Sequence, residues 1–477
     1  VKPPTDQSCV MTATGSTVTP IRPDEVLDCE PTGTKASQDL TMKELIERWV
    51  DSGDIQIVER EVDPRFECAA VIARAQRESD RPILFRNIKG SALPVASNLF
   101  GSRQRLSEYL GAGDGHFCQR WATLMKNPVA PPTVVPESDG EFRSASLDEL
   151  PQLTYFEKDA APYITSGIFL ANQPDTGVPN LSYHRGMHIS NDEVRVRLGT
   201  SHDLNRYQAA AEANGSALDA AILIGPPPEV AMAAASPIPP DESELDLVSR
   251  LIGGPLKMRP CRHVALDVPY DTEIVIEGRI LPNVRRPEGP FGEFLGYYVP
   301  QGDNHVLEVL GVTIRESATY HALVCGSPED QRLLELALCN RVFAHLDGTL
   351  RGILDVSCVP NLLNTVVKID KHYDGHARQV ILGAFGVHHD FVKSAMVVDA
   401  DVDLNDLSDV YWAFLTRGRA DDRVIIVPDV PGFYYGERKE HWGRIGFDCT
   451  MAMDRRADFE RKQIPGIDDI DLRDYVV

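Results

Sequence analysis

The sequence predicts a mixed α/β protein built from more than one domain. Short strand-like runs broken by glycine and proline fill the middle of the chain, which is typical of a β-barrel or a sandwich. Towards the C-terminus, apolar runs of strand length alternate with helix-like patterns, as in a layered βαβ sheet. The chain has 477 residues, which is too many for one compact core.

The N-terminal part is predicted to be a small α/β unit preceded by a flexible arm. Residues 1–38 mix proline, threonine, serine and aspartate without an apolar period, which is typical of a loose arm. An apolar stripe of helical spacing then runs from Leu45 to Val50 and ends at Asp51–Asp54. The elements expected next are a strand at 55–60, a helix at 65–78 and a strand at 82–86.

The middle and C-terminal parts differ in their predicted elements. Strand-like runs in the middle lie at 163–168, 194–198, 220–224, 273–277 and 305–309, with helices near 203–213 and 242–252. After a helix at 331–346, strands are expected at 352–357, 364–369, 394–399 and 423–427, and helices at 374–386 and 405–418. The second pattern predicts a sheet with parallel crossovers.

Shifts in composition divide the chain into four predicted segments. The polar, proline-bearing stretch at 112–150 indicates a boundary region. The segments are the arm at 1–38, an α/β domain at 39–150, a strand-rich domain at 151–335, and an α/β domain with a tail at 336–477.

Composition excludes several classes of function. The formal net charge of −23 argues against nucleic acid or an anionic membrane surface as partner, because both need a basic footprint. The nine cysteines include no C-x-x-C pair, and no apolar run approaches the length of a membrane helix. No signal-peptide pattern and no dinucleotide or Walker phosphate loop is present. We therefore expect a soluble cytoplasmic protein.

The most informative motif is the hexapeptide Glu288-Gly289-Pro290-Phe291-Gly292-Glu293. Two glycines and a proline interrupt helical and strand periodicity and allow the two flanking carboxylates to converge. Converging carboxylates repel each other, so the pKa of at least one should rise, and such a group can donate a proton near neutral pH. The motif indicates a proton-transfer site, and the alternative is a surface loop with two solvated glutamates.

A second group of residues could bind an anion or a metal. Asn180 and Arg185 follow a proline- and glycine-containing loop, while His202 and Glu244 each stand at a predicted helix start. Asn, His and Glu together form a mixed oxygen and nitrogen set that suits manganese or magnesium better than zinc. Taken singly, each also fits an ordinary helix cap or surface residue. Lys393 precedes an apolar strand, where loops build sites, although the residues alone favour a solvated strand-end lysine.

These motifs resemble the UbiD family of reversible decarboxylases, which includes ferulic acid decarboxylase. The resemblance runs from about residue 40 to about residue 466 and rests mainly on the hexapeptide at 288–293 together with the N-x-S-x-x-R pattern at 180–185. Further matching stretches are Ile83–Gly90, Asn98–Ser102, Ser236–Pro239, Val398–Asp403 and Asp409–Ala413. The fold that it implies has a flavin-binding split β-barrel at 151–335 and a C-terminal oligomerisation domain at 336–477.

The resemblance implies a site and a cofactor. The implied cofactor is prenylated FMN, with Mn²⁺ held by Asn180, His202 and Glu244 against the flavin phosphate, and K⁺ nearby. Arg185, Glu288 and Glu293 match the catalytic group of the family: Arg185 hydrogen-bonds the substrate carboxylate or Glu288, and Glu293 supplies the proton that replaces CO₂. The implied cofactor-binding residues are Asn180, Ser182, Arg185, His202, Ser236, Pro237, Glu244 and Lys393.

The implied reaction is the reversible, non-oxidative decarboxylation of an α,β-unsaturated or (hetero)aromatic acid, with electrons flowing into the cofactor as CO₂ leaves. Phenazine, pyrrole, furan and indole carboxylates and unsaturated natural-product acids all remain open. The implied partners are the acid, CO₂, a flavin prenyltransferase as cofactor supplier, and further copies of the chain in a homodimer or homohexamer.

The sequence departs from the family pattern at two places: His184 stands where small residues are common, and Ala234-Ala235-Ser236 replaces a run richer in hydroxyl groups and methionine. The alternatives are a manganese-dependent hydrolase and a non-catalytic flavin-binding relative.

Overall fold

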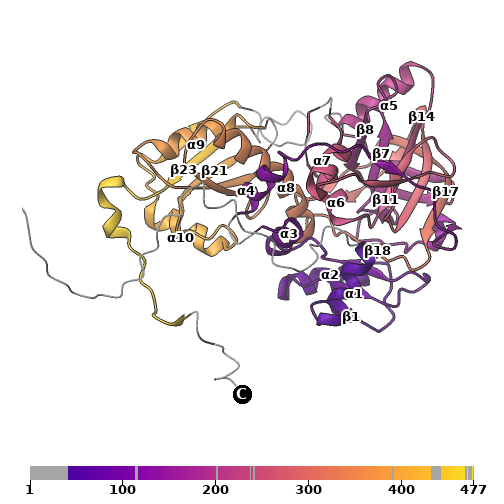
Figure 1. The fold of residues 1–477 in the computed structure, drawn as a ribbon, viewed down its shortest axis with the longest axis horizontal. Helices are drawn as coiled ribbons and strands as arrows, with labels where there is room; N and C mark the ends of the chain where they lie inside the picture. The colour runs from indigo at the N-terminus through magenta and orange to yellow at the C-terminus, as the bar shows by residue number, and fades with distance from the viewer. Residues whose placement is uncertain are drawn as a thin grey trace, which may run out of the picture. The chain divides into compact units, whose positions relative to one another are not determined.

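The computed structural model of the chain has the predicted mixed α/β fold (Figure 1). The arm at 1–38 and Pro237 lie outside the described residues. The structure describes residues 41–112, 116–199, 202–236, 238–239, 242–388, 391–430, 442–467, 470 and 475.

The N-terminal layer is a four-stranded sheet in the order β1-β2-β3-β18 with helices α1 to α4. Thr41 and Glu44 form a capping box at the start of α1, and Gly53 ends the helix in the left-handed conformation with φ +76°. The bounds are α1 Met42–Ser52, β1 Gln56–Val58, α2 Glu67–Glu78, β2 Ile83–Phe85, β3 Val95–Ser97, α3 Arg103–Leu110, α4 Phe117–Leu124 and β18 Tyr320–His321. The predicted helix–strand–helix–strand order is confirmed here, and β18 comes from far along the chain.

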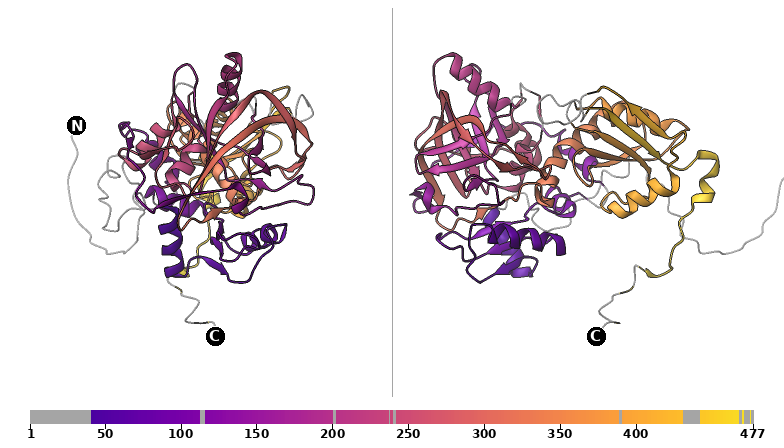
Figure 2. Two further views of the ribbon diagram at one scale, coloured as in Figure 1. Left: turned by 90° about the vertical axis from the view of Figure 1, so that its right-hand side faces the viewer. Right: turned by 180° about the vertical axis from the view of Figure 1, so that it is seen from behind.

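The central sheet has nine strands, and its main path runs β6-β9-β10-β17-β14-β11-β7-β8, with β5 paired to β17. Its two longest strands, β14 and β17, pair antiparallel and curve together (Figure 2, left). No pairing between the ends of this path closes a barrel in the described part of the chain. The strands are β5 Phe142–Ala145, β6 Tyr163–Ile164, β7 Ile168–Asn172, β8 Pro179–Tyr183, β9 Gly186–Ser190, β10 Glu193–Val196, β11 Leu218–Ile224, β14 Ile274–Glu288 and β17 Gly302–Arg315.

Three helices and two small sheets accompany the central sheet. Ser243 caps α7 by accepting a hydrogen bond from the Leu245 N–H, and Gly253 ends that helix with φ +69°. The predicted helices near 203–213 and 242–252 are confirmed as α5 and α7. The bounds are α5 Asp203–Ala213, α6 Pro228–Ala234, α7 Glu244–Ile252, β4 Thr133–Val134, β12 Lys257–Pro260, β13 Asp267–Pro269, β15 Phe291–Gly292 and β16 Tyr298–Val299.

The C-terminal sheet has the order β19-β20-β21-β23-β22, and the crossover from β20 through α9 to β21 is parallel, as predicted. Sequence analysis did not predict β23, which inserts between β21 and β22. The bounds are α8 Pro328–Asp347, β19 Ile353–Ser357, β20 Asn364–Ile369, α9 His376–Phe385, β21 Ser394–Asp399, α10 Leu407–Arg417, β22 Val424–Val427 and β23 Arg444–Cys449, with short 3₁₀ turns at Leu147–Glu149 and Met453–Phe459.

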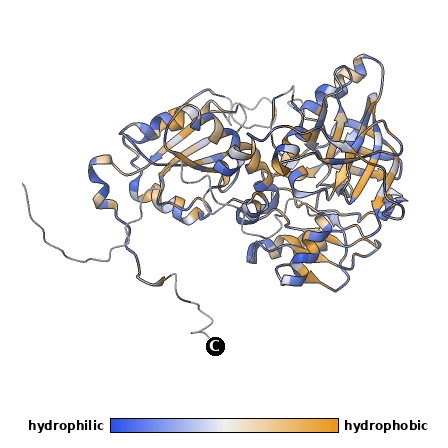
Figure 3. Ribbon diagram, viewed as in Figure 1, coloured by the Kyte–Doolittle hydropathy of each residue, from blue (hydrophilic) through white to orange (hydrophobic). Residues whose placement is uncertain are grey.

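Both faces of the C-terminal sheet are covered, which explains its near-continuous apolar strands (Figure 3). Val367 and Val397 belong to the hydrophobic cluster that contains Ile381 of α9. Their neighbours Val366 and Val398 belong to a second cluster with Val410 of α10. Because side chains alternate along a strand, α9 and α10 cover opposite faces.

Buried polar contacts connect α8 to the N-terminal segment. Arg103 of α3 donates to Glu335 at 2.7 Å and to Asp355 at 2.9 Å, and all three side chains are buried. The Glu329 carboxylate accepts hydrogen bonds from the backbone N–H groups of Asn98 and Leu99 at 2.6 and 2.7 Å. The domain boundaries at 150 and 335 stay predictions.

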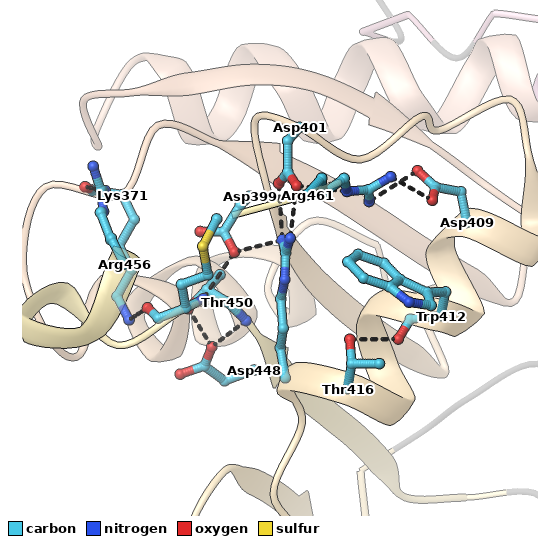
Figure 4. Close-up of polar contacts among 12 residues, drawn as sticks. Lys371, Asp399, Asp401, Asp409, Trp412, Thr416, Asp448, Thr450, Arg456 and Arg461 are labelled. Atoms are coloured by element: carbon cyan, nitrogen blue, oxygen red, sulfur yellow. Dashed lines mark hydrogen bonds and ion pairs between the residues drawn. The ribbon is translucent and has the colours of Figure 1, made fainter. Parts of the chain in front are cut away.

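The segment after β23 is held on the C-terminal sheet by arginines (Figure 4). Arg461 pairs with Asp401 at 2.7 Å and with Asp409 of α10 at 2.8 Å, and its guanidinium lies 4.0 Å from the centre of the Trp412 ring. Arg456 donates to the carbonyl of Lys371.

Among the described helices, none combines the length and hydrophobicity needed to span a membrane.

Candidate active site

The centre of the candidate site is a buried ion pair between Arg185 and Glu288. Arg185 lies between β8 and β9, and Glu288 is the last residue of β14. The arginine Nε and Nη2 atoms donate to the two oxygens of Glu288, both at 2.8 Å. The side chain of Glu288 is fully buried and that of Arg185 is 10% exposed. This planar, two-point geometry is available to arginine and not to lysine.

Two further side chains complete the hydrogen bonding of Glu288. The Tyr163 hydroxyl of β6 donates to Oε1 at 3.0 Å, and the Asn304 amide of β17 donates to Oε2 at 2.9 Å. Burial raises the pKa of Tyr163 well above its usual range, and the charge of Glu288 adds to the rise. The phenol therefore stays a donor, and the carboxylate is held by donors on every side.

The ring of Phe291 forms one wall of this centre. The Arg185 guanidinium lies 4.6 Å from the centre of the Phe291 ring, and the Tyr163 ring lies 4.5 Å from it. Burial lowers the pKa of Arg185, but its hydrogen bond to Glu288 and the charges of Glu288, Tyr163 and Glu293 outweigh burial, so the net pKa is raised. The guanidinium is therefore a fixed positive charge.

The turn at 288–293 connects the end of β14 to Glu293 through the short strand β15. The Gly289–Pro290 bond is cis, and Gly289 has φ +91°, a conformation that side chains with a Cβ atom rarely adopt. Asp159 holds the far side of the turn by accepting from the Gly292 N–H at 2.9 Å. Beyond it, the Glu293 N–H donates to the Tyr297 carbonyl at 2.9 Å.

Glu293 is half-buried and belongs electrostatically to the same site. Its negative charge contributes to the raised pKa of Arg185 and also raises the pKa values of Cys325 and Asp330. Arg185 and Glu288 are thus in direct contact, and Glu293 lies within electrostatic range of the arginine. Their catalytic roles stay predictions.

A second polar group surrounds Asn180 of β8 and Glu244, the first residue of α7. Glu244 accepts from the Asn180 amide at 3.0 Å and from the Leu181 N–H at 2.8 Å. Both side chains are buried, and burial raises the pKa of Glu244 to about 7, while these hydrogen bonds lower it and the charge of Asp203 raises it. A cation beside this carboxylate would offset its burial.

His202 joins this group through His184. The Ser182 hydroxyl lies 2.9 Å from both the Asn180 Oδ1 atom and the His184 Nε2 atom. The rings of His184 and His202 are 5.2 Å apart, and His202 is exposed before α5. Burial, together with the charge of His202, lowers the pKa of His184 to about 3, so its ring is neutral.

The residues fit the predicted divalent ion by their chemistry. Asn180 and Glu244 offer hard oxygen atoms in a buried place, and His202 offers an imidazole nearby. In the described part of the chain, no three His, Cys, Asp or Glu side chains are placed to hold a metal. The predicted metal site therefore needs the side chain of Asn180 as one of its ligands. The metal assignment stays a prediction.

The remaining predicted cofactor residues differ in position. Ser236 is buried just after α6, and its hydroxyl donates to the Met232 carbonyl at 2.8 Å. Lys393 lies just before β21 in the C-terminal sheet, and its role in cofactor binding stays a prediction. Pro237 is not described.

Sequence reasoning missed four residues that build the site: Tyr163, Asn304, Asp159 and Asp330. Tyr163 was placed in a predicted strand without a role, and Asn304 is 16 residues from its partner Glu288. A buried strand tyrosine needs a partner for its hydroxyl, which was a usable signal. Nothing local in the sequence indicates the other three.

Family models match the chain in three consecutive segments. Residues 46–125, 130–328 and 334–449 match, in turn, the N-terminal domain, the Rift-related domain and the C-terminal domain of the 3-octaprenyl-4-hydroxybenzoate carboxy-lyase family, UbiD. The three matches together span most of the chain.

Individual relatives are similar over nearly their full length. The anhydromevalonate phosphate decarboxylase of Methanothermobacter thermautotrophicus is 33% identical over 413 residues, which are 85% of this chain and 96% of the relative. The UbiD-class enzyme HmfF from Pelotomaculum thermopropionicum, solved with FMN, is 32% identical with a TM-score of 0.84 and covers 91% of this chain and 100% of its own. An evolved dimeric form of that enzyme, solved with prFMN, is 31% identical with a TM-score of 0.82 over the same shares of the two chains. The chain therefore belongs to the UbiD family and is a carboxy-lyase.

Proposed function

We propose that this protein catalyses the reversible, non-oxidative decarboxylation of an α,β-unsaturated or (hetero)aromatic carboxylic acid with prenylated FMN as cofactor. The observation that carries the proposal is the buried Arg185–Glu288 pair, with the half-buried Glu293 within electrostatic range of the arginine. A fixed positive charge beside a proton donor is what replacement of CO₂ by hydrogen requires.

The proposed cofactor residues lie at and around β8. When bound, prenylated FMN supplies an electron sink for the electron pair that CO₂ leaves behind. Asn180, Glu244 and His202 would hold Mn²⁺ beside its phosphate, and K⁺ is proposed nearby. Metal bridging lets a protein of net charge −23 bind an anion without a basic patch.

The chain's own residues would position the acid and move one proton. Arg185, held by Glu288, presents its positive charge to the substrate carboxylate. The C–C bond to the carboxylate breaks, CO₂ departs, and the Glu293 carboxyl donates its proton to the same carbon atom. Glu293 then regains a proton from solvent, so the balance is one carboxylate and one proton consumed for one CO₂ and one C–H product.

The similarity to a relative that acts on anhydromevalonate phosphate makes that acid the first substrate to assay. Phenazine, pyrrole, furan and indole carboxylates follow, because a single arginine suits a monocarboxylic acid.

The test is an absorbance spectrum and a native mass spectrum of protein co-expressed with a flavin prenyltransferase in the presence of Mn²⁺. We expect a bound mass of prenylated FMN and, with one acid of the panel, release of CO₂. Protein that binds the metal but no flavin would contradict the proposal and favour a manganese-dependent hydrolase.

Glu293→Gln should abolish decarboxylation, because the amide cannot donate the required proton, while the flavin stays bound. Glu308→Gln, an exposed change on β17, serves as the matched control and should keep wild-type turnover. Steady-state CO₂ release and flavin absorbance are measured on both. Turnover in the Glu293 variant above about 1% of wild type would move the acid role to another residue.

A further inference from the structure

We propose that His184 is a positioning residue for the cation site: its ring fixes the Ser182 hydroxyl and, through that hydroxyl, holds the side-chain amide of Asn180 in one orientation. This inference rests on the proposed metal site of Asn180, His202 and Glu244. Neither the sequence motifs nor the family resemblance assigns a role to His184.

The strand β8 places three polar side chains on one face. Residues two apart along a strand point to the same side, and Asn180 and Ser182 pair with β7 in regular register. The backbone N–H of His184 continues this pairing by donating to the Gly167 carbonyl at 3.2 Å. The three side chains therefore follow one another along the same face.

Hydrogen bonds link these side chains to Glu244. The Ser182 hydroxyl donates to the Asn180 Oδ1 atom at 2.9 Å, and its oxygen lies 2.9 Å from the His184 Nε2 atom. At the other end of the amide, the Asn180 Nδ2 atom donates to Glu244 Oε1 at 3.0 Å. The reverse orientation of the amide would place Oδ1 against the carboxylate, so one orientation is favoured. In that orientation Oδ1 keeps a second lone pair for a cation.

The His184 ring is itself fixed by its neighbours. It is buried and stands edge-on to the Phe169 ring at 5.5 Å. It also lies 5.2 Å from the His202 ring, which packs so closely on Gly199 that a Cβ atom added there would lie 3.3 Å from the imidazole. His184 thus contacts one proposed ligand directly and reaches Asn180 through one hydroxyl. Removing a residue that orients a metal ligand in this way weakens metal binding by on the order of 10- to 100-fold.

The experiment titrates Mn²⁺ alone into the full chain without flavin and measures free Mn²⁺ by electron paramagnetic resonance. His184→Phe keeps a buried aromatic ring but removes the nitrogen that contacts Ser182, so its dissociation constant for Mn²⁺ should rise about tenfold. His184→Gln places an amide, which can donate or accept, near the position of Nε2 and should recover most of this loss. Melting temperatures measured without metal report the folding of each variant.

A double-mutant cycle separates an effect through Ser182 from a direct effect on His202. Ser182→Ala removes only one hydroxyl and should weaken Mn²⁺ binding by a similar factor. Because both changes break the same chain of hydrogen bonds, the double variant should lose no more affinity than either single variant. His188→Phe, the same exchange on β9 at a ring that pairs with Asp148 at 3.4 Å, is the matched control and should leave the dissociation constant unchanged.

Wild-type Mn²⁺ affinity in either His184→Phe or Ser182→Ala would overturn the proposal. Losses that multiply in the double variant would also overturn it, as would a His184→Gln variant that binds as weakly as His184→Phe, because His184 would then act by shape or through His202. A wild-type chain that binds no Mn²⁺ would overturn the metal site and this inference together. The proposed decarboxylation is tested separately by the bound flavin mass and by CO₂ release, so its failure is distinguishable from failure of this inference.

Discussion

The Glu288 carboxylate receives four hydrogen bonds from the side chains of Arg185, Tyr163 and Asn304. A buried carboxylate with all its acceptor sites filled stays in one orientation, and it holds the arginine in place in turn. The site therefore separates two glutamates by environment: Glu288 is fully buried and paired, and Glu293 is half-buried within electrostatic range of Asp330 and Cys325. This difference in environment supports the proposed roles, in which Glu288 holds Arg185 in place and Glu293 donates the proton.

At the residue scale, Arg185→Lys should reduce kcat by on the order of 10² to 10⁴ even though the charge is kept. The ammonium group cannot make the two parallel hydrogen bonds, so one oxygen of Glu288 loses its partner. Steady-state decarboxylation with flavin content measured in parallel checks this.

Lys257→Arg, at an exposed position on β12, is the control for a cation exchange and should change nothing. Wild-type kcat in Arg185→Lys would show that positive charge alone is sufficient, which would contradict the two-point geometry as a requirement.

At the element scale, β14 connects the site to a structural carboxylate. The strand ends at Glu288, and the residue before its first residue is Glu273, which is fully buried. Glu273 accepts from the Thr319 N–H at 3.1 Å, and Arg315 lies 3.9 Å from its Oε1 atom. Burial raises the pKa of Glu273 to about 7, against the lowering effects of Thr319 and Arg315.

This shift predicts a pH dependence of stability. A carboxyl group whose pKa is raised on folding binds more protons in the folded state, so it destabilises the fold as pH rises from about 4.5 to about 7. Glu273→Gln removes that penalty. The melting temperature of Glu273→Gln minus that of the wild type should therefore increase from pH 5 to pH 8.

Thermal unfolding at four pH values checks this, with Glu308→Gln as the exposed control whose difference should stay flat. A difference for Glu273→Gln that is constant or decreases with pH would contradict a raised pKa.

The C-terminal sheet shows what local pattern predicts and what it misses. The crossover from β20 through α9 to β21 was predicted, because apolar strands and an amphipathic helix are local signals. β23 was missed, although it pairs parallel with β21 and antiparallel with β22. Its strand pattern is weak, and only pairing on both sides makes it a central strand.

At the scale of the whole molecule, exposed apolar side chains form a candidate interaction surface. Leu407, Tyr411 and Leu415 form one stripe along α10 and are 43%, 54% and 67% exposed. Ile464 and Ile467, in the segment after the Arg461 anchor, are also exposed. Patches of this kind on a folded protein mark interaction sites. A homodimer or homohexamer through the C-terminal part remains our proposal.

Leu415→Asp should shift the protein to a smaller species, because a charge buried at an interface is costly. Light scattering coupled to size-exclusion chromatography measures the mass. Ile57→Asp on β1, far from α10 in the sequence and also exposed, is the control and should leave the mass unchanged. An unchanged mass for Leu415→Asp would place the interface elsewhere.

The sequence by itself determined the mixed α/β class, most of the elements, and the residues Arg185, Glu288, Glu293, Asn180 and Glu244 as candidates. Turn formers, apolar period and motif spacing are local properties, so they can be read along the chain. Only the tertiary structure decided which partners complete the site. Tyr163 is 125 residues from Glu288, and Gln331 of α8 donates to the carbonyl of Phe294, the residue after Glu293. Such pairs are created by strand pairing and helix packing, which bring together residues that share no local pattern.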